Sequence, residues 1–82
     1  MANIHYTGTS INAVMMTRTR REPGAGDLIT ETVVVAAQKA FSDASLTPKE
    51  NDFITYGGVD YLVKGIEEDP LSATYTFPVV KI

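Results

Sequence analysis

The sequence has 82 residues, no cysteine and a formal net charge of −3, and because a chain of this length supports one hydrophobic core, we expect a single domain over residues 1–82. Without cysteine there is no disulfide framework and no thiolate metal site, and the acidic balance argues against a general binder of nucleic acid or anionic membranes. The longest apolar run, from Val33 to Ala37, is far shorter than the roughly 20 residues that span a bilayer, so we expect no membrane-spanning segment and no membrane partner.

The N-terminal half begins with a polar segment, and we expect residues 1–10 to form a flexible tail. This segment has neither the basic nor the apolar region of a secretory signal, which predicts that the protein stays where it is made. Ile11 to Arg21 contains the isoleucine, valine and threonine that are typical of a strand. Residues 22–27 combine proline and glycine, and therefore predict an exposed loop.

Leu28 to Ala44 admits two interpretations. Its run Thr30-Glu-Thr-Val-Val-Val35 is dense in β-branched residues, which favour a strand. The apolar positions of the same segment also fit one face of a helix. We expect a strand through about Phe41, because it would complete a hairpin with the preceding strand, and we keep a helix over about residues 33–45 as the alternative.

Two β-rich runs flank Gly57-Gly58, and this pattern predicts a hairpin with a two-residue turn. A tight turn makes Tyr56 face Val59, and alternate residues then share one face of the sheet. We expect that face to point to the core, with Ile54, Tyr56, Val59, Tyr61 and Val63 on it.

The segment from Ala73 to Ile82 alternates apolar and polar residues and predicts the last strand. Pro78 has no N–H to give to a ladder, so we place this strand, or one side of its end, at a sheet edge that could pair with another copy. The predicted fold is mainly β, a small antiparallel β-sandwich or barrel-like sheet of about five strands. The alternative prediction adds one short helix around residues 33–45.

Three arginines stand close together beside the predicted loop, and an acidic corner, Glu67 to Asp69, precedes the last strand. A strand places Arg18 and Arg20 on one face and Arg21 on the other, and their guanidinium groups can bind carboxylates or phosphates bidentately. If copies pack head to tail, this basic end of one copy would meet the acidic corner of the next. The residues predicted to bind partners are Arg18, Arg20, Arg21, Gly24, Gly26, Glu67, Glu68, Asp69 and Pro78.

The sequence offers no group of residues that predicts a reaction centre. His5 is the single histidine, and the sequence has no cysteine that could bind zinc together with it. Gly24-Ala25-Gly26 begins like a dinucleotide fingerprint, but the third glycine of that fingerprint would fall at Ile29. We therefore expect no enzyme activity, no metal and no cofactor.

The signature of head–tail joining, or head-closure, proteins of long-tailed bacteriophages is similar to the segment Lys49-Glu-Asn-Asp52-Phe-Ile-Thr-Tyr-Gly-Gly58-Val-Asp-Tyr61-Leu-Val63-Lys-Gly-Ile66-Glu-Glu-Asp69. The resemblance covers about half of the chain well, from Phe41 to Ile82. One departure is Asn51, which stands where the family usually has glycine; asparagine tolerates the left-handed conformation that glycine would supply. The residues that carry the match are Asp52, Gly58, Tyr61, Val63 and Asp69.

This resemblance implies a structural protein of the virion, made in the bacterial host cytoplasm and encoded by a phage or a prophage. Its copies would form a ring, commonly six-fold, between the portal or connector protein and the tail protein. The ring would close the exit after DNA packaging and present a surface for tail docking. The arginines would contact the neighbouring copy or DNA in the channel, and the tail and loop would become ordered on assembly.

A different class of function is also compatible with a small β domain. Tyr56, Tyr61 and Tyr75 could serve as stacking platforms for single-stranded nucleic acid beside the arginines. The acidic balance of the chain argues against this alternative.

Overall fold

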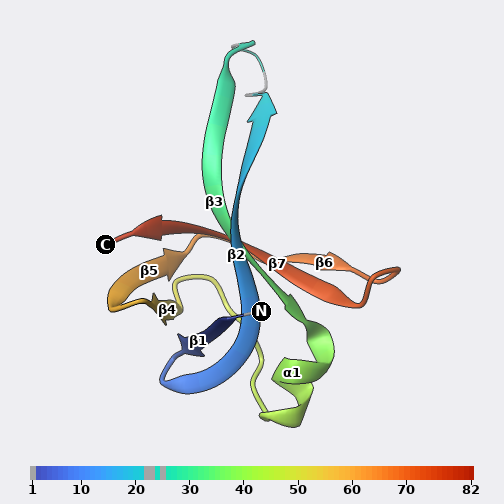
Figure 1. Cartoon of the computed structure of the whole chain (residues 1–82). Coiled ribbons are helices and arrows are strands. Elements are labelled where there is room, and N and C mark those ends of the chain that lie inside the picture. Colours follow the sequence, from blue (N-terminus) through green and yellow to red (C-terminus); the bar gives the residue numbers. More distant parts are fainter. Residues whose placement is uncertain (1, 22–23, 25) are drawn as a thin grey trace.

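Antiparallel strands make up most of the structure, and one short helix interrupts them (Figure 1). The computed structural model describes residues 2–21, 24 and 26–82. In chain order the elements are β1 (Ala2–Tyr6), β2 (Thr9–Arg21), β3 (Leu28–Ala37), α1 (Gln38–Asp43), β4 (Phe53–Tyr56), β5 (Val59–Val63), β6 (Glu67–Asp69) and β7 (Thr74–Lys81).

The strands form one sheet in the order β3-β2-β1-β4-β5-β7-β6, and β3 also pairs with β7. That additional pairing closes a ring of hydrogen bonds, because β3 and β7 are otherwise separated by four strands in the order. The arrangement is not a regular barrel. It confirms the predicted mainly β, antiparallel class, with seven strands in the described part of the chain where about five were expected.

Four aromatic rings fill the centre of the core. Phe41 lies 4.9 Å from Tyr6 and 5.4 Å from both Tyr75 and Phe77, measured between ring centroids. Its contacts with Tyr6 and Tyr75 are edge-to-face, a geometry that the ring quadrupoles favour. The buried core also contains Ile4, Ile11, Ala13, Val34, Ala36, Ile54, Val63 and Val79.

The predicted Gly57-Gly58 hairpin is confirmed, with Tyr56 opposite Val59. Both glycines have positive φ, 60° and 80°, as a type I′ turn requires. Asn51 has a φ of 69°, so it does adopt the left-handed conformation expected of it at that position.

The prediction of a flexible tail over residues 1–10 is wrong. β1 pairs with β2 on one side and with β4 on the other, and a two-residue turn at Thr7 and Gly8 connects β1 to β2. Ile4 and Tyr6 are buried on the core face of β1. The polar composition concealed this strand because only its alternate residues enter the core.

The expected strand through Phe41 is too long. β3 ends at Ala37, and α1 follows within the range that the helical alternative covered. The β-branched run stops at Val35, and alanine, glutamine and lysine then favour a helix. A single helical turn aims Phe41 into the core, and the carbonyl of Phe41 accepts a 2.8 Å hydrogen bond from the Leu46 N–H.

Pro78 does not lie at a free sheet edge. β7 pairs with β3 on one side and with β5 and β6 on the other. Pro78 stands where β5 has ended and β6 has not begun, and its carbonyl accepts a 2.8 Å hydrogen bond from Lys64 N. Another residue at this position would direct its N–H into the same gap as this carbonyl, where no strand lies to accept it. Proline therefore removes no inter-strand hydrogen bond from the sheet.

The hydroxyl of Tyr6 joins β1 to the segment before β4. It donates a 2.7 Å hydrogen bond to Asp52 Oδ2 and accepts a 3.2 Å bond from Lys49 N. Burial, and then the hydrogen bond to the Asp52 carboxylate, raise the pKa of Tyr6 above its ordinary value. The hydroxyl therefore stays protonated across the physiological range.

Replacing Tyr6 with phenylalanine should lower the free energy of unfolding by about 1.5–3 kcal/mol, since a bond to a charged acceptor is lost. A tyrosine pKa raised by folding adds stability that is full below the unfolded value and is lost as the pH rises from that value through the folded one, so the wild type should begin to lose this advantage above about pH 10. Denaturant unfolding at pH 7 and pH 10.5 measures both effects. Tyr56→Phe is the control, because its hydroxyl has no hydrogen-bond partner among the described residues; equal losses in the two variants would contradict the assignment.

Candidate interaction site on the β2–β3 arm

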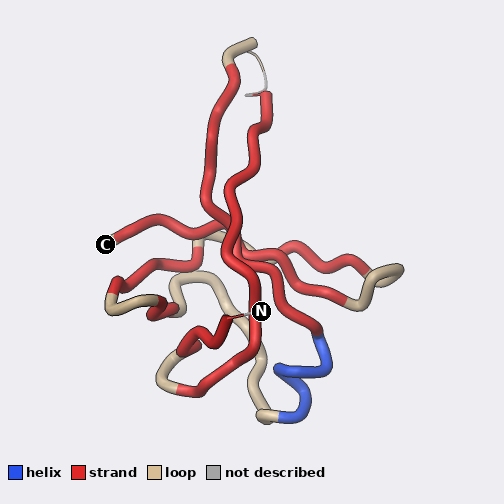
Figure 2. The backbone as a smooth tube through the Cα atoms, in the orientation of Figure 1, coloured by secondary structure: helices blue, strands red, loops and turns tan. Residues whose placement is uncertain are grey.

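The β2–β3 hairpin extends well beyond the sheet body (Figure 2). β1 pairs with β2 only up to Ala13, and β7 pairs with β3 only from Thr32 to Ala37. Beyond these points Thr17–Arg21 and Leu28–Glu31 pair only with each other. We call residues 17–31 the arm.

The arm contains three arginines, Arg18, Arg20 and Arg21, and one exposed large apolar side chain, that of Leu28. The Leu28 side chain is 66% exposed, and Met16 at the base of the arm is 48% exposed. The predicted loop 22–27 lies partly outside the described residues. Within the described part, Gly24 and Gly26 have positive φ, and the Gly26 carbonyl accepts a 2.9 Å hydrogen bond from Arg21 Nη1.

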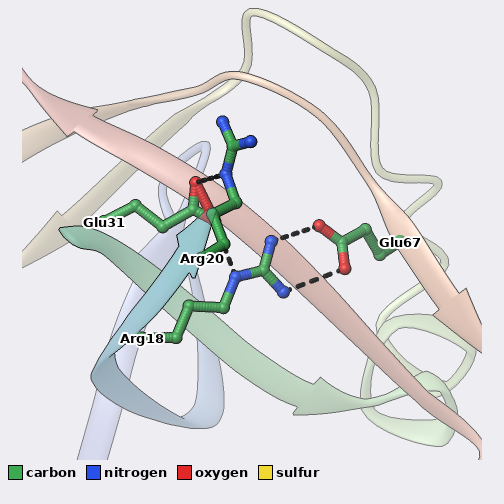
Figure 3. A network of polar contacts seen from close by, with 4 residues as sticks. All are labelled: Arg18, Arg20, Glu31 and Glu67. Carbon is green, nitrogen blue, oxygen red and sulfur yellow. Dashed lines mark hydrogen bonds and ion pairs between the residues drawn. The ribbon is translucent and has the colours of Figure 1, made fainter. Parts of the chain in front are cut away.

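Four charged side chains form a network at the base of the arm (Figure 3). Arg18 Nε donates to Glu31 Oε2 at 2.6 Å, and its two terminal nitrogens donate to the two oxygens of Glu67. Arg20 Nε donates to Glu31 Oε1 at 3.1 Å. Arg18 thus reaches across β7 to β6 and ties the arm to the far strand of the sheet (Figure 3).

The network shifts the ionisation of its members. The hydrogen bond from Arg18 lowers the pKa of Glu67, and bonds from Arg18 and Arg20 lower the pKa of Glu31. The same bonds raise the pKa of Arg18, so its charge is constant at every accessible pH. Arg18, Glu31 and Glu67 are therefore ionised in neutral solution.

The structure confirms that Arg18 and Arg20 share one strand face, since both bond to the same carboxylate. It corrects the place of the acidic corner, which is the short strand β6. Arg18 finds Glu67 within its own chain, so this pair is not free to join two copies. Of the other two acidic residues, Glu68 lies on the opposite face of β6, and Asp69 Oδ1 accepts bonds from the backbone of Leu71 and Ser72.

Glu31 was not predicted as a site residue, although the sequence contains a signal for it. A connection of six residues, 22–27, sets Arg21 opposite Leu28, and counting back along both strands then sets Arg18 opposite Glu31. Lys64 and Lys81 were also missed, because Lys64 follows β5 and Lys81 lies in β7, and only the β5–β7 pairing brings them to the same region.

A cleft of about 720 Å³ lies between the base of the arm and the end of β7. The charged residues that line it are the four basic side chains Arg18, Arg20, Lys64 and Lys81 and the two acidic side chains Glu31 and Glu67. Its apolar lining includes Ile29, Val79 and Val80. The cleft and the arm together form the candidate interaction site.

Replacing Glu67 with glutamine should lower the free energy of unfolding by about 0.2–1 kcal/mol at pH 7, as expected for an exposed ion pair. Folding lowers the pKa of Glu67, so the wild-type advantage is present above the unfolded value and disappears as the pH falls through the folded one. Urea unfolding at pH 7 and from about pH 5 downward would follow this change. Glu68→Gln is the matched control on the opposite face, and an equal pH effect in both variants would contradict the role of Arg18.

No protein-family model matches the chain, and no curated protein matches it at a significant level. No helix in the described part is long and apolar enough to cross a membrane. Among residues 2–21, 24 and 26–82 there is no group of three or more histidine, cysteine, aspartate or glutamate side chains that could hold a metal ion.

Proposed function

We propose that the chain is a structural subunit of the virion of a long-tailed phage or prophage, where copies form a ring that joins the head to the tail. The observation that carries the proposal is the arm, which extends from the sheet body with both of its strand edges unpaired among the described elements and with the Leu28 side chain exposed. Unpaired edges and exposed apolar side chains are features of surfaces that pair with other chains.

The fold suits such a role because the body and the arm have different properties. The body has a closed ring of hydrogen bonds and an aromatic core, which make it a rigid spacer. The arm reaches outward and can contact a neighbouring copy, the portal or connector protein, the tail protein or DNA in the channel. The ring, commonly six-fold in the family that the sequence resembles, would close the exit after packaging.

The nucleic-acid alternative gains no support from the described residues. Tyr75 packs against Phe41 in the aromatic core, and Tyr61 is partly buried against the same core. A stacking platform needs a ring face open to the bases. Tyr75 packs its ring against other aromatic rings, while Tyr61 lines the cleft.

Disruption of the gene in the phage or prophage that encodes the chain tests the proposal. We expect cells to accumulate DNA-filled heads and separate, complete tails, because only the joint is missing. Electron microscopy of the lysate measures this, with the gene supplied in trans as the control. Normal joined virions without the gene would refute the proposal, and a lack of packaged heads would assign the chain an earlier role.

A further inference from the structure

The cleft arises because β3 and β7 separate from each other (Figure 2). They pair from Ala37 and Thr74 to Thr32 and Val79, and then β3 continues into the arm while β7 follows β5. A wedge therefore opens between the Leu28–Glu31 part of β3 and the last residues of β7.

Strand geometry determines which backbone groups face this wedge. The carbonyl of Pro78 points to Lys64, away from β3, so its partner Val33 directs its own N–H and carbonyl to β2. Backbone groups alternate in direction along a strand, so those of Thr30 and Leu28 both point away from β2. Thr30 lines the cleft, and Leu28 continues the same edge just beyond it. They have no partner strand among the described elements.

The charges around the cleft do not cancel. Glu31 and Glu67 are both engaged by Arg18 and Arg20. Lys64 and Lys81 line the same cleft and form no ion pair with any described residue. The cleft thus combines an open strand edge with two uncompensated ammonium groups.

We propose that this cleft binds an extended acidic segment of a partner protein, which adds a strand to the free edge of β3. The backbone of the segment would bond to Thr30 and Leu28, and its carboxylates would pair with Lys64 and Lys81. A strand rising about 3.4 Å per residue, in a layer about 10 Å thick with strands about 4.8 Å apart, takes roughly 160 Å³ per residue. The cleft of about 720 Å³ accordingly holds about four residues, the length of the open β3 edge.

This binding does not depend on the proposed place in the virion, since it follows from the edge and the charges alone. Single-stranded nucleic acid would also be attracted by the lysines, but it cannot form the backbone ladder that an open strand edge offers. Removing one edge N–H therefore separates the two classes of partner.

The experiment selects short random peptides on the full-length protein and measures their affinity by fluorescence anisotropy. Thr30→Pro removes the N–H that faces the cleft and none that bonds to β2. Thr19→Pro is the matched control, because Thr19 stands opposite Thr30 on the outer, unpaired edge of β2. Lys64→Glu and Lys81→Glu reverse the cleft charges, and Lys49→Glu is the control for net charge.

We expect acidic peptides to be selected. Their affinity should fall at least tenfold, which is about 1.4 kcal/mol, in Thr30→Pro and in the double variant Lys64→Glu and Lys81→Glu. Thr19→Pro and Lys49→Glu should change the affinity little. Failure to select acidic peptides, or equal affinity in Thr30→Pro and Thr19→Pro, would overturn the proposal. A labelled single-stranded oligonucleotide that binds the wild type, loses affinity in the lysine variants and is indifferent to Thr30→Pro would assign the cleft to nucleic acid instead.

Discussion

Replacing Phe41 with alanine should lower the free energy of unfolding by about 3–5 kcal/mol, the range measured for buried phenylalanines. Phe41 is 1% exposed and its ring contacts those of Tyr6, Tyr75 and Phe77. The helix that holds it is one short turn, so little neighbouring structure can collapse into the space that the ring leaves. A domain of this size has roughly 4–12 kcal/mol of stability in total, so the variant should be at best marginally folded.

The matched control is Phe53→Ala, because Phe53 is the same residue type at 53% exposure. We expect the control to change the free energy of unfolding by less than about 1 kcal/mol, as is usual for surface positions. Urea unfolding followed by circular dichroism measures both variants. Similar losses at the two positions would contradict the assignment of Phe41 as the centre of the core.

Replacing residues 19–30 with Asn-Gly should abolish head–tail joining while leaving the sheet body folded. Arg18 and Glu31 face each other as a hydrogen-bonded pair, which is the register that a two-residue type I′ turn closes. The variant therefore keeps the Arg18 contacts with Glu31 and Glu67 but loses the tip of the arm. The described strand residues of the tip pair only with each other, and the deletion removes one exposed ion pair with the rest of the chain, that of Arg20 with Glu31, so stability should change by no more than about 1 kcal/mol.

Complementation of the gene disruption measures the effect of this variant on joining. We expect the level of joined virions to equal that without the gene, although the variant protein is soluble and folded. The control variant Leu71→Ala removes a side chain that is 97% exposed at the turn between β6 and β7, away from the arm, and should complement fully. Full complementation by the arm variant would contradict the role of the arm.

Local signals in the sequence predicted local structure well. The Gly57-Gly58 pair fixed one hairpin and its register, because two positive φ values in succession require residues of this kind. Asn51 was correctly expected in the left-handed region. The face shared by Arg18 and Arg20 followed from strand alternation alone.

Features that depend on distant partners could not be predicted. Nothing near Pro78 in the sequence says that β3 pairs with it on one side and that β5 ends and β6 begins on the other, so this position was taken for a free sheet edge. Tyr6 is a core residue only because Asp52 satisfies its hydroxyl from 46 positions away. The pairing of Arg18 with Glu67 likewise requires the order of β2, β3, β7 and β6, which no local pattern contains.

Electron cryomicroscopy of virions from the phage or prophage that encodes the chain tests the central proposal most directly. The account predicts several copies of this fold in a ring between the portal and the first tail ring, with residues 17–31 of each copy in contact with another chain. Intact virions whose joint contains no density for this fold would contradict it.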